Sequence, residues 1–405
     1  MAGSIQSTET IDGAGFPLAF KVRQGTRRPL SLGIDSGFDA YKVEARALGG
    51  HQKEAVVTEG QAGSAWRMVS DEGANLKGTD LAPFPLGFMA AGLQADLENR
   101  IARHALARGI AIAELHTDVA TDYAFQGSFF KGDGRGTAFP PVFRVSIDAD
   151  APEPSIARVV ADALAGSPGI ALLRTSLANT FALYANGRRR PMQHLRTSSR
   201  PDAADPLKTW RESPRPLERA QVLPNLIEKA AAASGQGTVM PATAPGQAVR
   251  IDIPIRGRSS FETGTTRSEA WSDRPGGSRF AFRTDERSDQ DSGPTGLGLI
   301  AAGVAFCFMT QLLRYTEYHQ MKIRALRIVQ ESPFEIAGRA AQAHVFDTHV
   351  FVHGEEDDET MERLVTMAAN TCYLHAALHA ALEPRVSVQL NGRAVTPAPY
   401  WRPTE

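Results

Sequence analysis

Two cysteines in 405 residues, Cys307 and Cys372, are the side chains best suited to chemistry. Cys307 lies in the middle of the apolar run "AGVAFCFMTQ", and Cys372 lies in "AANTCYL", where a turn precedes a second apolar helix. Unpaired backbone N–H groups in the first turn of a helix favour a thiolate, so this position predicts a reactive Cys372. The alternative is two unrelated buried cysteines that pack as small hydrophobic residues.

Histidines are the second set of candidates. His349 and His353 share one face of the strand "THVFVHG", and His375 and His379 follow Cys372 on one side of a helix. Two histidines at such spacing can bind a metal ion, but neither pair has a third ligand in view. We therefore expect ordinary packed histidines, no metal site and no cofactor.

Composition excludes several classes of partner. The chain has 44 basic and 45 acidic residues and a net charge of −1, so neither nucleic acid nor a membrane is expected as a partner. No secretory signal is visible at the N-terminus, and two cysteines without one predict a cytoplasmic location. The uncharged run Ser292–Leu313 reaches the length of a membrane span, but we interpret it as a helix buried on all sides.

An internal repeat supports that interpretation. "LGFMAAGLQAD" (Leu86–Asp96) and "LGLIAAGVAFC" (Leu297–Cys307) are identical at five of eleven positions. "SDE" and "LYANGR" in the first half likewise match "TDE" and "VQLNGR" in the second half, in the same order. The first copy carries charges in the helix that corresponds to the uncharged run, which a membrane span would not tolerate. The sequence therefore predicts two copies of one unit.

Each copy has the same expected order of elements. Alternating β-rich segments come first, a long apolar helix follows at about 86–108 or 297–320, and further strands, two helices and a last strand complete the copy. This order predicts an α+β fold in which antiparallel strands pack on a long central helix. We expect domain 1 at residues 30–187 and domain 2, with both cysteines, at residues 248–395.

The segment between the copies, residues 188–247, is rich in Pro, Ser, Arg and Ala. We interpret it as a linker with one helical piece at about 217–233. The triple arginine Arg188–Arg190 is a candidate anion site, although a solvated loop is the simpler interpretation.

The cysteines and their contexts resemble those of the OsmC/Ohr family of thiol-dependent hydroperoxide reductases. The stretch "LIAAGVAFCF" is similar to the family pattern around its first cysteine, and Cys372 follows Cys307 by 65 residues, as the second family cysteine does. The resemblance covers about 35–187 and 248–393, and the first copy is recognised mainly through the second.

This resemblance implies a tandem pseudo-dimer in which one chain replaces the two subunits of an intertwined homodimer. It implies that Cys307 attacks the O–O bond of an organic hydroperoxide and that Cys372 resolves the sulfenic acid as a disulfide. A dithiol reductant such as a lipoyl protein would then reduce this disulfide. Further association into a homo-oligomer stays open.

The chain also departs from the family pattern. The family glutamate ten residues before the first cysteine corresponds to Leu297, and in the first copy to Leu86. The family arginine of the "GGR" hairpin corresponds to His51 in the first copy, while Arg267 is the candidate in the second. Asp96 and Ser167 replace the two cysteines in the first copy, so that copy cannot reduce peroxide.

Three hypotheses remain. The first is a cysteine-dependent reductase of organic hydroperoxides with Cys307 and Cys372 as its thiols and Arg267 or His51 as polar partner. The second is a hydrolase or lyase for a small metabolite in which His51 pairs with a nucleophilic Cys307. The third is a binding or assembly protein without catalysis.

Overall fold

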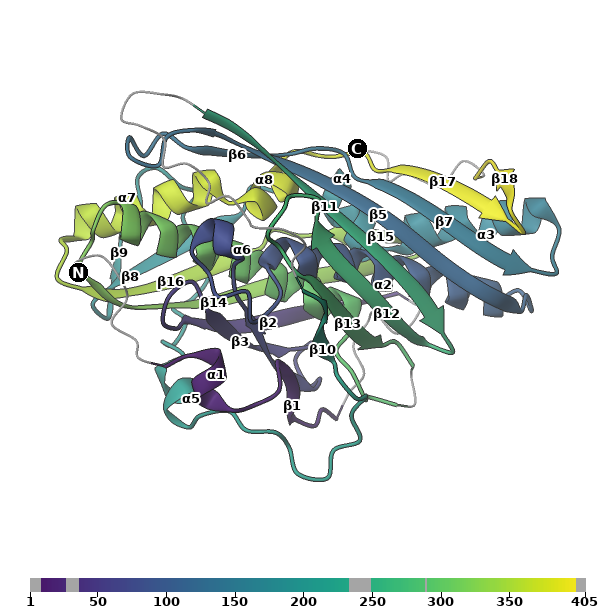
Figure 1. Ribbon diagram of the computed structural model, residues 1–405, viewed down its shortest axis with the longest axis horizontal. Helices are drawn as coiled ribbons and strands as arrows, with labels where there is room; N and C mark the ends of the chain where they lie inside the picture. The colour runs from purple at the N-terminus through teal and green to yellow at the C-terminus, as the bar shows by residue number, and fades with distance from the viewer. Residues whose placement is uncertain (1–8, 27–35, 233–248, 288–289, 398–405) are drawn as a thin grey trace.

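The computed structural model describes residues 9–26, 36–232, 249–287 and 290–397, which form two nine-stranded sheets and eight α-helices (Figure 1). The expected α+β class is therefore confirmed. The expected domain limits near residues 30, 247 and 248 lie outside the described residues, and the division into two domains stays a prediction.

The first sheet joins strands from both halves of the chain. Its order is β1-β4-β3-β2-β14-β16-β8-β9, with β15 paired to β14. The bounds are Ala19–Arg23 (β1), Gly37–Ala47 (β2), Lys53–Thr58 (β3), Ala65–Ser70 (β4), Thr180–Ala185 (β8), Arg188–Arg190 (β9), Ile323–Ala337 (β14), Ala340–Ala343 (β15) and Asp347–Gly354 (β16). The long strand β14 links the halves because it pairs with β2 over ten residues.

The second sheet has a matching order, β10-β13-β12-β11-β5-β7-β17-β18, with β6 paired to β5. Its strands are Ile112–Gly127 (β5), Arg135–Ala138 (β6), Val142–Ala149 (β7), Ile227–Ala231 (β10), Val249–Glu262 (β11), Thr265–Ser272 (β12), Arg279–Asp285 (β13), Arg385–Leu390 (β17) and Arg393–Val395 (β18). Here β5 links the halves through its pairing with β11. Two pairings depart from the expected antiparallel pattern, since β8 joins β16 and β17 joins β7 in parallel.

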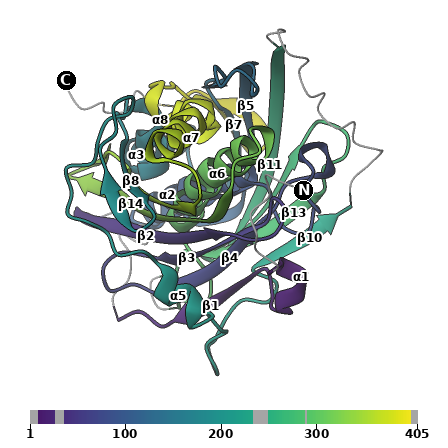
Figure 2. The same ribbon diagram turned by 90° about the vertical axis from the view of Figure 1, so that its left-hand side faces the viewer.

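Helices fill the space between the two sheets (Figure 2). The long helices α2 (Pro85–Leu106) and α6 (Gly296–Tyr318) pack on each other, with α2 against β11 and β12 and α6 against β2 and β3. Each is followed later in the chain by a pair of shorter helices, Glu153–Gly166 (α3) with Pro168–Arg174 (α4) and Asp358–Thr371 (α7) with Tyr373–His379 (α8).

Two glycines allow α2 and α6 to approach each other closely. A Cβ on Gly92 would lie 2.6 Å from the carbonyl oxygen of Gly296, and a Cβ on Gly303 would lie 3.1 Å from that of Pro85. Both glycines belong to the "AAG" stretches of the repeat. The repeat motif therefore encodes a tight helix crossing, because only glycine leaves room for the facing backbone.

Helix α6 is long and apolar enough to cross a bilayer by length and composition, but its apolar window is entirely buried inside the structure. Its neighbours are α2, α7, α8 and strands of the first sheet. A helix covered on all sides in this way is the expected core helix.

The segment between the two halves differs from expectation. No helix forms over the described part of 217–233; Ile227–Ala231 is instead strand β10, which pairs with β13 at the edge of the second sheet. The short helix of this segment is α5 (Leu207–Arg211). Burial of Ile227 against the sheet outweighs the local helix propensity of the alanine-rich run.

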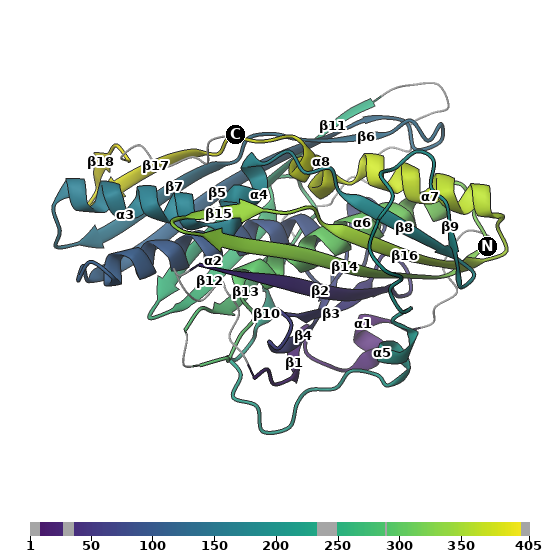
Figure 3. The same cartoon turned by 180° about the vertical axis from the view of Figure 1, so that it is seen from behind.

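A short N-terminal helix, α1 (Ile11–Ala14), and α5 lie on the side of the first sheet that faces away from α2 and α6 (Figures 1 and 3). The helix layer and the cysteines lie on the opposite side of this sheet. The part of the linker around α5 therefore lies on the outer side of the first sheet, away from the cysteines.

Candidate active site

The fold brings the two cysteines together. Cys307 lies midway along α6, and Cys372 lies between α7 and α8, where its backbone is extended and its position is the N-cap of α8. Both are free and buried, and the Cys307 thiol is close enough to influence the Cys372 thiol directly. A strand also packs tightly here, since a Cβ on Gly136 of β6 would lie 2.5 Å from the carbonyl oxygen of Thr371.

The expected thiolate at Cys372 is not what the structure favours. Burial raises the pKa of Cys372 well above its ordinary value, and the neighbouring Cys307 thiol raises it further. The backbone N–H groups of Leu374 and His375 act in the opposite direction but with a smaller effect. The prediction from the helix start was wrong, because full desolvation of a thiol outweighs the N–H groups of one helical turn.

An apolar pocket of about 90 Å³ leads to Cys307 but not to Cys372. Its apolar lining comes from Leu76, Ala82, Phe84, Pro85, Leu86, Ile253 and Ile255. Its polar lining includes Glu72, Asp80, Arg274, Thr310, Gln311, Arg314 and Tyr373. A small molecule that enters this pocket therefore meets the Cys307 thiol first, with Cys372 buried behind it.

Arg314 is the cation that the sequence reasoning missed. It follows Cys307 by seven residues on the same helix, so both side chains lie on one face, and both line the pocket. Its side chain is buried, stacks 3.8 Å from the centre of the Phe129 ring and contacts the Gln311 side-chain oxygen at 3.4 Å. The i, i+7 spacing of Cys307 and Arg314 could have indicated from the sequence that the two side chains lie on one face of the helix.

A buried polar chain lies beside the thiol. Thr310 donates its hydroxyl to Glu72 at 2.6 Å, and the Lys53 ammonium lies 3.0 Å from the same Glu72 oxygen. The Glu72 charge is therefore compensated by a buried partner. Lys53 and Glu72 come from strand β3 and the residues after β4, so the first half of the chain contributes to the environment of a cysteine in the second.

The structure does not place His51 beside Cys307. Its Nε2 atom lies 3.2 Å from the Glu317 carboxylate, ten residues after Cys307 and therefore about 15 Å further along α6. Hydrogen bonds from His51 and Lys77, opposed by partial burial, lower the pKa of Glu317 to about 2. His51 thus belongs to a polar contact at the end of the helix.

Arg267 also lies away from the pocket. It pairs with Glu269 at 2.6 Å, with 38% of its side chain exposed. The adjacent Thr266 hydroxyl instead donates to Glu98 of α2. Because successive side chains of a strand point to opposite faces, Arg267 points away from the helix layer. Its position in the hairpin could be inferred from the sequence, but the face to which it points could not.

The first half of the chain has a corresponding junction. Ser167, between α3 and α4, donates its hydroxyl to Asp96 of α2 at 2.5 Å, and the Gly169 N–H donates to the same oxygen at 2.9 Å. Arg100 pairs with the other Asp96 oxygen at 3.5 Å. Ser167 also accepts the Ile170 N–H as the N-cap of α4. The residues that replace the thiols are therefore held in hydrogen bonds and a buried ion pair.

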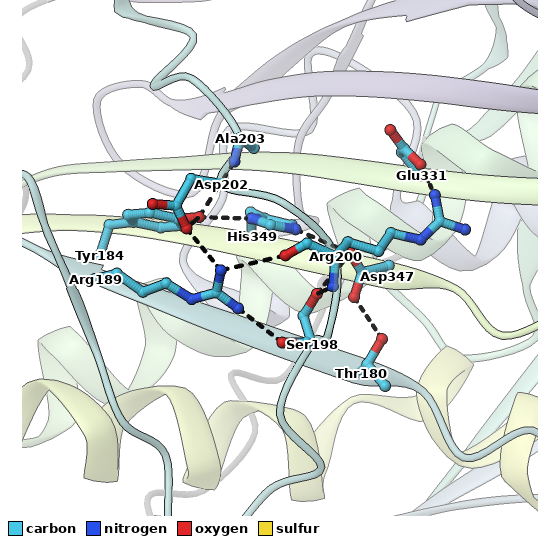
Figure 4. Close-up of polar contacts among 10 residues, drawn as sticks. All are labelled: Thr180, Tyr184, Arg189, Ser198, Arg200, Asp202, Ala203, Glu331, Asp347 and His349. Carbon is cyan, nitrogen blue, oxygen red and sulfur yellow. Dashed lines mark hydrogen bonds and ion pairs between the residues drawn. The ribbon is translucent and has the colours of Figure 1, made fainter.

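A polar cluster on the first sheet contains His349 and Arg189, the middle residue of the triple arginine (Figure 4). His349 lies between Asp347, at 2.9 Å, and the Tyr184 hydroxyl, at 3.0 Å. Arg189 pairs with Asp202 at 2.6 Å, and Arg190 pairs with Asp358 at 2.9 Å. Arg189 thus holds Asp202 of the linker against the first sheet, and Arg190 joins β9 to α7, so these two arginines are paired; Arg188 is exposed.

The remaining histidines form no metal centre. No group of three or more potential ligands occurs within the described residues. His353 contacts Asp205 at 3.0 Å, whereas His375 lies between the rings of Phe181 and Phe308, its two nitrogens without hydrogen-bond partners in the described structure. Burial lowers the pKa of His375 to about 4.

Comparison with known proteins finds a similar family over part of the chain. A family model described as OsmC-like protein matches residues 289–387, which include both cysteines. No curated protein matches the chain. Among solved structures, an OsmC-like hydroperoxide resistance protein from Jannaschia sp. CCS1 is 21% identical over 35% of this chain and 95% of its own, with a TM-score of 0.24. The matched segment, residues 289–387, contains α6, α7, α8 and the two cysteines and is similar to the OsmC family.

Proposed function

We propose that the protein is a cysteine-dependent reductase of organic hydroperoxides, with Cys307 as the peroxidatic and Cys372 as the resolving thiol. The observation that carries this proposal is the contact between two free thiols, of which Cys307 but not Cys372 lines the apolar pocket. The family match at residues 289–387 supports it. Sulfenic acid formation followed by disulfide exchange requires such an arrangement of a reachable thiol and a resolving thiol.

In the proposed reaction the Cys307 thiolate attacks one peroxide oxygen, an S–O bond forms and the O–O bond breaks. The Cys372 thiol then displaces water from the sulfenic acid, which gives the disulfide. Arg314 is the pocket cation on the face of Cys307, and we assign it the stabilisation of the developing negative charge. It would take over a role that Arg267 and His51 cannot perform from their positions.

The second part of the proposal is that the chain is an internal pseudo-dimer built from two copies of one unit. Three features support it: the matching strand orders of the two sheets, the mixing of both halves in each sheet, and the reciprocal glycine contacts of α2 and α6. In such an arrangement one chain provides what two intertwined subunits otherwise provide. Glu72 and Lys53 at the Cys307 site illustrate this contribution across the halves.

The proposed reductant is a dithiol in the cytoplasm, such as a lipoyl protein. Cys372 is fully buried, so a reductant reaches the disulfide through Cys307. A dithiol closes its own ring after the first exchange and therefore releases the protein thiols without a second encounter. The small apolar pocket favours an organic hydroperoxide over hydrogen peroxide as substrate.

Steady-state turnover tests the function. With dihydrolipoamide as reductant, we expect consumption of cumene hydroperoxide with a higher kcat/KM than of hydrogen peroxide. Replacement of the dithiol by glutathione should slow turnover. No peroxide consumption with any dithiol would refute the proposal.

The hydrolase or lyase hypothesis finds less support. It depended on a histidine beside Cys307, and His51 contacts Glu317 instead. No histidine is among the described residues that line the pocket. A general base for such chemistry has to lie within hydrogen-bond reach of its nucleophile.

A further inference from the structure

The hydroxyl group of Tyr373 is a buried polar group that the proposed reaction has not yet used. Tyr373 begins α8 directly after Cys372, is 5% exposed and lines the pocket together with Cys307. The Arg314 guanidinium approaches its hydroxyl oxygen, and its O–H has no acceptor among the described residues. A buried O–H group without an acceptor is unfavourable, so its place in the pocket lining points to a ligand as the acceptor.

Its surroundings keep the Tyr373 phenol protonated and place the Arg314 guanidinium near it. Burial raises the pKa of Tyr373 to about 12, whereas the nearby Arg314 guanidinium lowers it. Cys307 and Glu72 are close enough to raise it, which places the phenol among the groups at the bottom of the pocket. At neutral pH the group can therefore donate a proton, and Arg314 is placed to stabilise the resulting tyrosinate.

The other hydroxyl groups near the thiols are not equivalent to it. Thr310 lines the pocket, but its hydroxyl is donated to Glu72. The Tyr123 ring lies 6.1 Å from that of Tyr373 but is not part of the pocket lining. At the junction in the first half, the residue after Ser167 is Pro168, which has no hydroxyl.

We propose, building on the peroxidase function above, that Tyr373 is the general acid that protonates the leaving oxygen of the hydroperoxide. The Cys307 thiolate attacks the terminal oxygen of ROOH and becomes the sulfenic acid as the O–O bond breaks. The bonding electron pair leaves with the inner oxygen as RO⁻. This oxygen takes the Tyr373 proton to give the alcohol ROH, and the tyrosinate regains a proton from water.

This assignment predicts a dependence on the leaving group. An alkoxide is strongly basic and gains from protonation as it leaves, whereas the carboxylate that a peracid releases is weakly basic and gains little. The loss of a general acid therefore slows alkyl hydroperoxides selectively. A residue with a purely structural role would slow both classes alike.

The test is stopped-flow oxidation of wild type, Tyr373→Phe and Tyr123→Phe by cumene hydroperoxide and by peracetic acid. We expect Tyr373→Phe to slow the reaction with cumene hydroperoxide about 100-fold and that with peracetic acid by less than about threefold. Tyr123→Phe should leave the ratio of the two rates as in wild type. Equal slowing of both peroxides by Tyr373→Phe, or no slowing, would overturn the assignment.

A second measurement avoids dependence on the stability of the variant. In wild type, a proton transferred to the leaving oxygen predicts a solvent deuterium isotope effect with cumene hydroperoxide that is absent with peracetic acid. Identical isotope effects with both peroxides would also overturn the assignment. If wild type reacts with neither peroxide, the peroxidase function itself fails, which is a separate outcome.

Discussion

Two junctions of the molecule have the same geometry and opposite chemistry. In each, the middle of a long helix meets the turn between two shorter helices: Cys307 meets Cys372, and Asp96 meets Ser167. The thiols have a pocket on one side, whereas Asp96 is held by Ser167, by a backbone N–H and by Arg100. The fold therefore determines which positions are in contact, and the side chains at these positions determine whether the contact is reactive or structural.

The largest expected effect is that of Cys307→Ser. A serine hydroxyl is not ionised at neutral pH and cannot attack a peroxide, so turnover with dihydrolipoamide should fall to the uncatalysed rate. The matched change at the other junction, Asp96→Ser, should leave Cys307 reactive in every molecule that folds. Retention of turnover by Cys307→Ser would show that Cys307 is not the peroxidatic thiol.

Substitutions at the Asp96 junction should lower the free energy of unfolding and not the reactivity of Cys307. Asp96→Asn removes the charge that pairs with buried Arg100, and breaking a buried ion pair destabilises by about 3 kcal/mol. Ser167→Ala, which removes the cap of α4, should cost about 1 kcal/mol. Urea denaturation measures both, and an unchanged midpoint for Asp96→Asn would contradict a structural role.

Arg314→Met tests the cation of the thiol junction. Loss of a group that stabilises developing charge should slow oxidation of Cys307 by cumene hydroperoxide about 100-fold. The control is Arg103→Met, since Arg103 follows Asp96 by the same seven residues and donates to the carbonyl oxygen of Glu286. If both variants slow the reaction equally, Arg314 has no special place beside the thiol.

The smallest effect concerns His375, whose counterpart after Ser167 is Ile170. The native state keeps His375 neutral down to a pKa of about 4, while the unfolded chain takes up a proton near pH 6.5. Stability is therefore lost as the pH falls from about 6.5 to 4, by about 2 kcal/mol at pH 5. His375→Ile should remove this loss in denaturation curves at pH 7.5 and 5; an identical pH dependence in both proteins would contradict it.

Patterns along the sequence were sufficient to predict the two long helices and the pair of thiols. The apolar runs predicted α2 and α6 to within about two residues, and the resemblance of the cysteine contexts to the OsmC/Ohr pattern predicted the pair that the structure brings into contact. These features are local, or they follow from the repetition of one motif. The sequence did not indicate a helix at α5 or a strand at β10, because packing against the sheets decides both.

The polar residues near the Cys307 thiol could not all be predicted from these patterns. Arg267 and His51 were chosen by position in a hairpin, but the face of a strand and its register against a helix depend on pairing between distant segments. Arg314 could have been found, because spacing within one helix is sufficient to place it on the face of Cys307. The contribution of Glu72 from the other half required the whole fold.

The most direct test of the central claim is a peptide map after reaction with one equivalent of cumene hydroperoxide. We expect a Cys307–Cys372 disulfide in the oxidised protein, loss of both free thiols and their recovery on addition of a dithiol. In Cys372→Ser, Cys307 should instead accumulate as a sulfenic acid that dimedone traps. Two unmodified thiols after this treatment, or turnover that Cys372→Ser leaves unaffected, would show that Cys307 and Cys372 are not a peroxidatic and resolving pair.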